Sequence, residues 1–151
     1  MSTTASDWVT GATVDPAILD RWPGYRVHLI AGEVDATGLA ALADELVERA
    51  VAAARSLEGD DPHVLRWRDA YRDFGVKPRV ARSSVDALLR RAVSEPGLPR
   101  IHALVDVYNA VSVLYRVPIG GEDLERYDGP PRLVVATGDE TFHTTVDGEP
   151  A

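Results

Sequence analysis

The sequence predicts an α+β fold in which a mostly antiparallel sheet packs with several helices. Apolar residues recur at helical spacing in separate segments between residues 39 and 115. Residues 25–34 instead alternate apolar and polar side chains, as a half-buried strand does. Two further stretches, residues 132–136 and 141–146, read as strands around a Gly138-Asp139 turn, which is typical of a hairpin.

Proline, glycine and the spacing of apolar residues predict where the first helices begin and end. After a loose, flexible arm expected over residues 1–15, Pro16 suits the first position of a short turn or helix. Residues 39–57 are rich in alanine and glutamate with apolar residues at helical spacing, so they predict an amphipathic helix. An acidic break ending in Pro62 starts the next helix, which runs to Phe74 and stops at a glycine.

Two more helices follow in the second half of the helical region. Ser83 or Ser84 caps the first of them, with Asp86 three residues after Ser83 as in a capping box. The other spans residues 100–115, and its predicted buried face consists of Ile101, Leu104, Val105, Tyr108, Val111, Ser112 and Tyr115. Aromatic residues at positions i, i+4 and i+7 of the preceding helix are expected in the core rather than as base-stacking platforms: Trp67, Tyr71 and Phe74.

Composition bounds the class of protein. A length of 151 residues indicates one domain, and 45% hydrophobic with 26% charged residues argues against global disorder. The absence of cysteine excludes disulfides and thiolate metal sites and favours a reducing compartment. The polar start of the chain has neither the apolar core of a signal peptide nor a membrane span, so we expect a cytoplasmic protein without a membrane partner.

Charge is distributed unevenly along the chain. The net charge of −8 argues against non-specific binding of nucleic acid, and no DNA partner is expected. Residues 62–100 nevertheless hold nine basic and four acidic residues, whereas the remainder holds seven basic and twenty acidic ones. This basic segment either meets a phosphate backbone at one face or pairs its arginines locally with Asp69, Asp73 and Asp86.

The common catalytic signatures are absent from the sequence. It contains no phosphate-binding P-loop, no GxGxxG, no GxSxG and no HExxH. The four histidines lie on different predicted elements without the spacing of metal ligands. We therefore predict no metal and no cofactor.

The most specific feature is a series of fixed spacings through the centre of the chain. It consists of Trp67-Arg68-x-x-Tyr71-Arg72-x-Phe74-Gly75-Val76-x-Pro78, Arg82-Ser83-Ser84, Asp86-Ala87-Leu88-Leu89-Arg90-Arg91, Leu98-Pro99, Val105-Asp106-x-x-Asn109, Pro118-Ile119-Gly120 and Asp123-Leu124. This pattern resembles the B3/B4 editing domain of the phenylalanyl-tRNA synthetase beta chain, particularly its free-standing bacterial form. The resemblance covers roughly residues 25–146 and implies a B3/B4-like domain over residues 16–151, shortened at its C-terminus.

The resemblance implies an aminoacyl-tRNA editing domain that hydrolyses the ester of a mischarged, aromatic-type aminoacyl-tRNA. Synthetase relatives place a histidine two residues after the shared proline, where this chain has Gly120. No catalytic residue is therefore assigned, and a possible deacylase activity stays open beside a non-catalytic tRNA-binding or protein-interaction module on the same scaffold. The chain has no ligase site, and the sequence does not determine its oligomeric state.

Two sets of candidate site residues follow. The pocket candidates are Asp106, Asn109, Pro118, Gly120 and Gly121. The candidates for contact with tRNA are Arg68, Arg72, Lys77, Arg79, Arg82, Arg90 and Arg91. The alternatives are that the aspartate and asparagine only tie loops down, and that the glycine pair only forms a turn.

Overall fold

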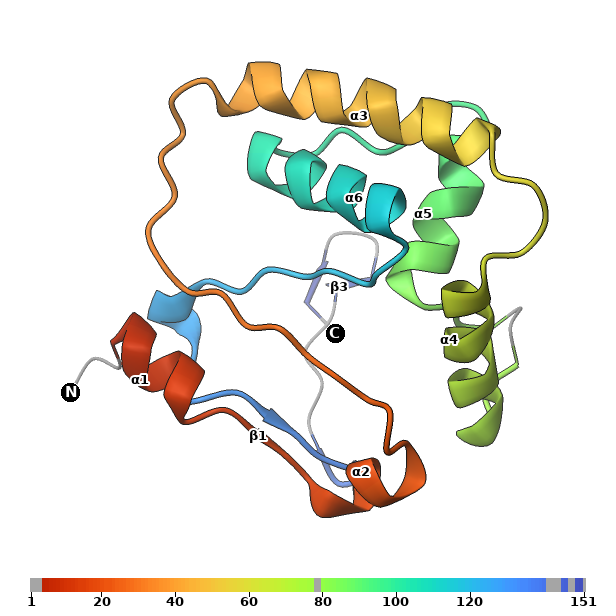
Figure 1. Ribbon diagram of the computed structural model, residues 1–151. Helices are drawn as coiled ribbons and strands as arrows, with labels where there is room; N and C mark the ends of the chain where they lie inside the picture. The colour runs from red at the N-terminus through yellow and green to blue at the C-terminus, as the bar shows by residue number, and fades with distance from the viewer. Residues whose placement is uncertain (1–3, 78–79, 141–144, 147–148, 151) are drawn as a thin grey trace. The chain divides into compact units, whose positions relative to one another are not determined.

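The computed structural model describes residues 4–77, 80–140, 145–146 and 149–150. The chain divides into a helical unit, Val34–Gly121, and a terminal unit, Met1–Glu33 with Glu122–Ala151 (Figure 1). The elements in chain order are α1 (Ala5–Thr10), β1 (Thr13–Val14), α2 (Pro16–Arg21), α3 (Leu39–Arg55), α4 (Pro62–Asp73), α5 (Ser84–Ala92), α6 (Ala103–Tyr115), the 3-10 helix η1 (Leu124–Arg126), β2 (Arg132–Leu133), β3 (Thr145–Val146) and β4 (Glu149–Pro150).

The predicted α+β fold class with a mostly antiparallel sheet is wrong, because the described residues are mostly helical. Their strands are two residues long: β1 pairs in parallel with β2, and β3 pairs antiparallel with β4. Residues 25–34, predicted as a strand, lie in neither a helix nor a paired strand. An alternating pattern describes side chains that suit a half-buried sheet, but a strand forms only where another strand pairs with its backbone.

The predicted hairpin is also corrected within the described residues. Its first strand is reduced to β2, which pairs with β1 instead of with a following strand. Residues 141–144 of its second strand lie outside the described residues. The turn itself is present, since Gly138 has a φ of +97° and the Glu140 carboxylate accepts hydrogen bonds from the backbone N–H groups of Thr137 and Gly138. These backbone hydrogen bonds, the one from Thr137 first, lower the pKa of Glu140 to about 2.

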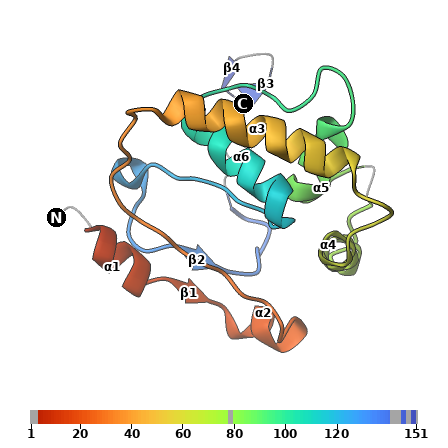
Figure 2. The same cartoon turned by 45° about the horizontal axis from the view of Figure 1, so that its top comes forward.

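The core of the helical unit is built largely from alanine. Helix α6 runs alongside α3, and α5 packs against both (Figures 1 and 2). The buried cluster between them consists of Ala50, Ala54, Leu88, Ala92, Leu98, Ala110 and Val113. Small side chains at a helix contact let the two axes approach closely, and the buried alanines of α3 and α6 provide such a contact.

The face of α6 that is buried differs from the predicted one. Ile101, just before the helix, and Tyr115 at its end are 70% and 72% exposed, although both were assigned to the core. Ala110 and Val113 are fully buried instead, and only Ser112 of the predicted face is buried with them. The periodicity of large apolar residues therefore gave the wrong face, because α3 presents alanines and accepts the alanine side of α6.

The start of α4 is tied to the end of α6. Asp61 caps α4 by accepting a hydrogen bond from the N–H of His63 at 2.8 Å, with Pro62 at the first helical position. The Nδ1 atom of His63 lies 2.9 Å from the carbonyl oxygen of Arg116. Arg116 ends α6 with a φ of 58°. The Ser112 hydroxyl donates a hydrogen bond to the carbonyl oxygen of Val117, the residue after Arg116, at 2.6 Å. These contacts position α4 on the helical unit.

The terminal unit is organised around a buried tryptophan. Trp8 lies on α1, within residues that the sequence predicts as a loose arm, and its ring meets that of Tyr127 edge to face at 5.6 Å. Thr4 caps α1 by accepting a hydrogen bond from the N–H of Asp7. Aromatic packing between the two ends of the chain therefore orders α1.

Gly11 is expected to tolerate no side chain. A Cβ atom there would lie 2.5 Å from Cγ of Pro130 and 3.0 Å from the carbonyl oxygen of Asp7. We expect Gly11→Ala to destabilise the terminal unit by about 1–3 kcal/mol through overpacking. Urea unfolding followed by Trp8 fluorescence, with Trp22 and Trp67 replaced by phenylalanine, measures this cost.

Gly24→Ala is the matched control, because a Cβ atom at that position meets nothing within 4 Å. It is expected to change the unfolding free energy by less than about 0.5 kcal/mol. An equal effect of the two substitutions would contradict the assignment of Gly11 as a packing position.

Candidate nucleic-acid interface

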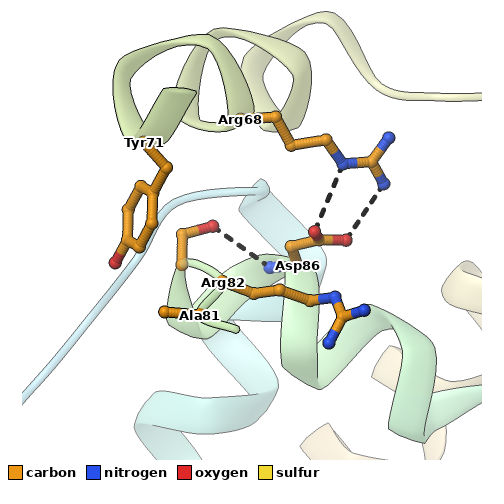
Figure 3. Close-up of a pocket in the computed structure, with 6 residues that line it drawn as sticks. Arg68, Tyr71, Ala81, Arg82 and Asp86 are labelled. Atoms are coloured by element: carbon orange, nitrogen blue, oxygen red, sulfur yellow. Dashed lines mark hydrogen bonds and ion pairs between the residues drawn. The ribbon is translucent and has the colours of Figure 1, made fainter. Parts of the chain in front are cut away.

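A buried carboxylate organises the corner where α4 meets α5. The side chain of Asp86 is 3% exposed, and its backbone N–H donates to the capping hydroxyl of Ser83. Arg68 of α4 donates to this carboxylate from Nε to Oδ2 at 3.2 Å and from Nη2 to Oδ1 at 3.0 Å (Figure 3). Arg90, one turn further along α5, adds a hydrogen bond from Nε at 3.2 Å. A bidentate ion pair therefore joins α4 to α5.

The electrostatics of this corner keep both partners charged. Burial raises the pKa of Asp86, but hydrogen bonds and charge from Arg68, with the charge of Arg90, outweigh burial and hold that pKa below its ordinary value. The hydrogen bond to Asp86 in turn raises the pKa of Arg68, whose Nη1 also donates to Asp60 at 2.8 Å. Two of the predicted RNA-binding cations thus have a structural role.

The predicted RNA-binding cations divide into paired and unpaired ones. Arg72, like the two arginines at Asp86, has a carboxylate partner, because it forms an ion pair with Asp69 on the same helix. Arg79 lies outside the described residues. Within the described part of residues 62–100, four exposed cations have no side-chain hydrogen bond or ion pair and are called the unpaired cations below: Arg66, Lys77, Arg82 and Arg91.

Arg66 begins the basic face, residues 66–91, that was predicted to contact tRNA, but it was not named among the individual candidates. Nothing in the local sequence around Arg66 on α4 shows that it lacks a carboxylate partner, whereas Arg68, two residues later, has one. Only the three-dimensional pairing of carboxylates distinguishes an available cation from a neutralised one. The local-pairing alternative therefore holds for part of the basic segment and fails for the rest.

The hollow beside the α4–α5 corner is too small to hold a substrate. Its volume is about 10 Å³, room for about one water molecule. The side chains drawn in Figure 3 line it: Arg68, Tyr71, Ala81, Arg82, Ser83 and Asp86. The hollow does show that Tyr71 and Arg82 are neighbours across the corner.

A second, larger hollow lies between α3 and the segment that follows α5. Its volume is about 280 Å³, close to the lower end of the range for small-molecule sites. Its lining residues are Val47, Val51, Arg55, Ala92, Ser94, Glu95, Pro96, Gly97, Leu98 and Arg100. The aliphatic members give it an apolar wall, and its charged members are Arg55, Glu95 and Arg100. No sequence signal predicted this hollow, because α3 contributes to it from a distant segment.

Arg100 is held beside the larger hollow by two carboxylates. Its Nε donates to Oδ2 of Asp106 at 2.8 Å, and its Nη2 forms an ion pair with Asp44 of α3. The hydrogen bond to Asp44 and then that to Asp106 raise the pKa of Arg100. Asp106 is buried and also accepts a hydrogen bond from the Ile101 backbone N–H at 2.9 Å. This aspartate therefore fixes both the start of α6 and the position of Arg100.

The remaining pocket candidates lie in the same unit as Asp106 but line neither hollow. Asn109 and Pro118 are half-buried, whereas Gly120 is exposed. Gly121 is close to an aromatic ring, since a Cβ atom there would lie 3.3 Å from Cε1 of Tyr108. Only Asp106 is connected to a hollow, through Arg100, and a pocket at the other four stays a prediction.

Residues 4–77, 80–140 and the short strands that follow contain neither a metal-ligand cluster nor a membrane-spanning helix. No group of three His, Cys, Asp or Glu side chains in this part of the chain is placed to hold a metal ion. No helix in it is long and apolar enough to cross a bilayer.

Comparison with known proteins decides the family. The family described as the B3/4 domain matches residues 66–150. The chain belongs to the B3/4 domain family. No curated protein and no solved structure matches the chain significantly.

The B3/4 match confirms the family that the spacings predicted. It begins at Arg66 in α4 and covers α5, α6 and the segment around the larger hollow, whereas α3 lies before it. The free-standing bacterial form and a shortened C-terminus stay predictions. The B3/4 assignment therefore covers all four unpaired cations and the Asp106–Arg100 pair.

Proposed function

We propose that this B3/4 domain binds aminoacylated tRNA and hydrolyses the ester of a mischarged, aromatic-type aminoacyl-tRNA. The observation that carries the proposal is the set of unpaired cations on and between α4 and α5, all within the family match. Cations without carboxylate partners are free to replace the counterions of phosphates, so they contribute to RNA affinity where paired arginines contribute little. The acidic remainder of the chain restricts this contact to one segment.

The larger hollow is the proposed position of the aminoacyl group. Helix α5 carries Arg91 next to Ala92, which lines the hollow, so the cationic segment and the hollow adjoin along one helix. The apolar wall suits an aromatic or similar side chain, and a volume of about 280 Å³ admits a group of that size. Arg100 uses Nε and Nη2 for its carboxylates, which leaves Nη1 for a substrate oxygen.

The chemistry needs little from the protein because an aminoacyl ester is already activated. A water oxygen attacks the ester carbonyl carbon, the ester C–O bond breaks, and the ribose hydroxyl leaves with a proton, releasing the free amino acid. Arg100 would stabilise the negative charge that develops on the carbonyl oxygen. Gly120 stands where synthetase relatives have a histidine, so positioning of water and charge stabilisation replace side-chain acid–base catalysis in this proposal.

Incubation with tyrosyl-tRNA and meta-tyrosyl-tRNA tests hydrolysis directly. Release of the labelled amino acid above the rate in buffer is expected, and it should fall in an Arg100→Ala variant. No release above buffer from either substrate, by protein shown to bind tRNA, would contradict the editing activity.

A double substitution of two unpaired cations tests the contact with tRNA. Arg82→Ala combined with Arg91→Ala is expected to weaken binding about equally for different RNA sequences and to reduce the salt slope of log K by about 2. Arg49→Ala is the matched control, because Arg49 lies on α3 and is already paired with Glu45 at 3.3 Å. Equal effects of the control and the double variant would count against this surface.

A second candidate function is tRNA binding without hydrolysis. It is favoured by Gly120, which removes the one side chain that synthetase relatives place at that position. Tight binding of tRNA, sensitive to the Arg82 and Arg91 changes but without release of amino acid, would establish it. The two candidates share the interface and differ only at the larger hollow.

A further inference from the structure

We propose that Glu95 binds the α-ammonium group of the aminoacyl ester in the larger hollow, so that the domain accepts esters with a free α-amino group and rejects N-blocked ones such as peptidyl-tRNA. This inference rests on the proposed function, which places the aminoacyl group in this hollow. It adds the recognition of a second substrate group, beside the carbonyl oxygen assigned to Arg100.

The first support is an available carboxylate at the hollow. Glu95 lies in the connection between α5 and α6, and it is the one acidic residue among those that line the larger hollow. Its side chain is exposed and forms no hydrogen bond or ion pair with another described residue. The neighbouring Ser94 hydroxyl, in contrast, already donates to the carbonyl oxygen of Arg91 at 3.3 Å. The carboxylate oxygens of Glu95 therefore keep their acceptor sites for the N–H donors of a ligand.

The second support is the placement of opposite charges around the hollow. The other charged residues that line it are Arg55, the last residue of α3, and Arg100. Neither arginine forms an ion pair with Glu95 in the described part of the chain, so the carboxylate stays separate from both guanidinium groups. An ammonium group is repelled by the arginines and attracted by Glu95, while a carbonyl oxygen is attracted by Arg100. The charges thus favour one orientation of an aminoacyl ester.

The third support is the setting of the carboxylate. Leu98, three residues after Glu95, is buried in the core cluster with Ala92, three residues before it. The connection that carries Glu95 is therefore fixed to the core on both sides by residues that also line the hollow. Val47 and Val51 of α3 add to the apolar wall. An apolar wall reduces the number of water molecules that compete for an ion pair, so a charge-assisted hydrogen bond beside it is stronger than one in bulk water.

A free α-amino group is the feature that this arrangement distinguishes. The α-ammonium group of an aminoacyl ester offers a positive charge and three N–H donors. In peptidyl-tRNA the same nitrogen belongs to an amide, which is neutral, has one N–H and carries a bulky acyl group. Loss of a hydrogen bond between charged groups is expected to lower affinity about 10-fold. The carboxylate of Glu95 would thus separate aminoacyl-tRNA from peptidyl-tRNA.

Binding of a non-hydrolysable analogue tests this recognition with the full chain. The probe is 3′-tyrosylamido-3′-deoxyadenosine, in which an amide replaces the ester. Its comparison ligands are the N-acetyl form and a form with a hydroxyl in place of the α-amino group, which keeps the size and lacks the charge. The wild type should bind the probe about 10-fold more tightly than either comparison ligand. Glu95→Gln should remove this preference by weakening the binding of the probe alone.

Glu48→Gln is the matched control. Glu48 is an exposed glutamate of α3 without a side-chain partner among the described residues, and it does not line the hollow. Its substitution changes the net charge equally and should leave all three affinities at wild-type values. Glu95→Asp keeps the charge and should retain part of the preference. Thermal unfolding of each variant verifies that the fold is intact.

The remaining outcomes separate failure of this proposal from failure of the proposed hydrolysis. Equal affinity of the wild type for the three ligands, or equal effects of Glu95→Gln and Glu48→Gln, removes the role of Glu95. Release of tyrosine from tyrosyl-tRNA would then leave the editing activity in place, as would release by a protein that does not bind the probe. A preference that depends on Glu95, without any release, supports the recognition and removes the hydrolysis. Absence of both binding and release removes both.

Discussion

Asp86→Ala is expected to lower the free energy of unfolding of the helical unit by about 3 kcal/mol. Breaking a buried ion pair by removing one partner costs roughly 3–5 kcal/mol, because the remaining charge stays desolvated. The Arg68 side chain is 19% exposed and keeps Asp60 at 2.8 Å, so the low end of that range applies. Urea unfolding followed by far-UV circular dichroism measures the change as a shift of the midpoint at constant slope.

The same residue predicts an acid limb in the stability curve. Because the pKa of Asp86 is lowered in the folded state, its stabilisation is present above the unfolded pKa of about 3.9 and is lost as pH falls through the folded value. Wild-type protein should therefore lose stability below about pH 4 more steeply than Asp86→Asn does. Unfolding midpoints measured across that interval compare the two slopes.

Arg90→Ala is the matched control for this network. Arg90 contacts the same carboxylate but is 57% exposed, so its loss is expected to cost less than about 1 kcal/mol. Arg68→Ala, in contrast, removes both hydrogen bonds that join α4 to α5. Equal effects of Asp86→Ala and Arg90→Ala would show that the α4–α5 connection does not depend on the buried pair.

Local signals in the sequence predicted the starts of α4 and α5 closely, although they missed α1, which lies within the predicted loose arm. Pro62 and the capping serine at position 83 lie at the first turns of α4 and α5 as predicted, and Gly75 follows the end of α4. Each of these residues acts through backbone groups within a few positions of itself, so its effect is readable without knowledge of the fold. The boundaries of helices with such capping signals were therefore accessible from one sequence.

Features that depend on distant partners were not accessible. The strand pattern of residues 25–34 requires a neighbouring strand, and the described residues provide none. The buried face of α6 is decided by the alanines of α3, more than fifty residues earlier in the chain. Large apolar residues such as Ile101 and Phe74 were assigned to the core because hydrophobicity was read without knowing which surface each would meet.

For the candidate site too, local signals were readable from the sequence, whereas contacts with distant residues were not. Fixed spacings of polar and turn residues gave the family, because such residues are tied to particular turns and contacts. The charge distribution identified the basic segment, but it did not separate Arg82, which is unpaired, from Arg68, which Asp86 neutralises. The larger hollow was missed since α3 contributes Val47 and Val51 from outside the segment that carries the spacings.

Asp106→Ala is expected to destabilise the helical unit by about 2–3 kcal/mol. The substitution leaves the backbone N–H of Ile101 without its acceptor at 2.9 Å in a part-buried position. It also removes the carboxylate that holds Nε of Arg100. Asp106→Asn keeps an oxygen that can accept from the Ile101 N–H, so it should cost only about 1 kcal/mol. Equal midpoints in urea for the two variants would show that this hydrogen bond does not stabilise α6.

Comparison of the two single variants Asp106→Asn and Asp44→Ala distinguishes an effect on stability from an effect on the rate of hydrolysis. Asp44 is exposed and pairs with Nη2 of Arg100, so its removal should leave stability within about 0.5 kcal/mol of wild type. If Arg100 stabilises charge at the larger hollow, both changes loosen its position and slow hydrolysis of aminoacyl-tRNA while tRNA affinity stays constant. Asp106 would then be a positioning residue, and a pH profile that keeps its shape would agree, since neither carboxylate exchanges a proton with the substrate. Unchanged hydrolysis in both variants would move the reaction away from Arg100, toward the half-buried Asn109 and the Gly120–Gly121 segment.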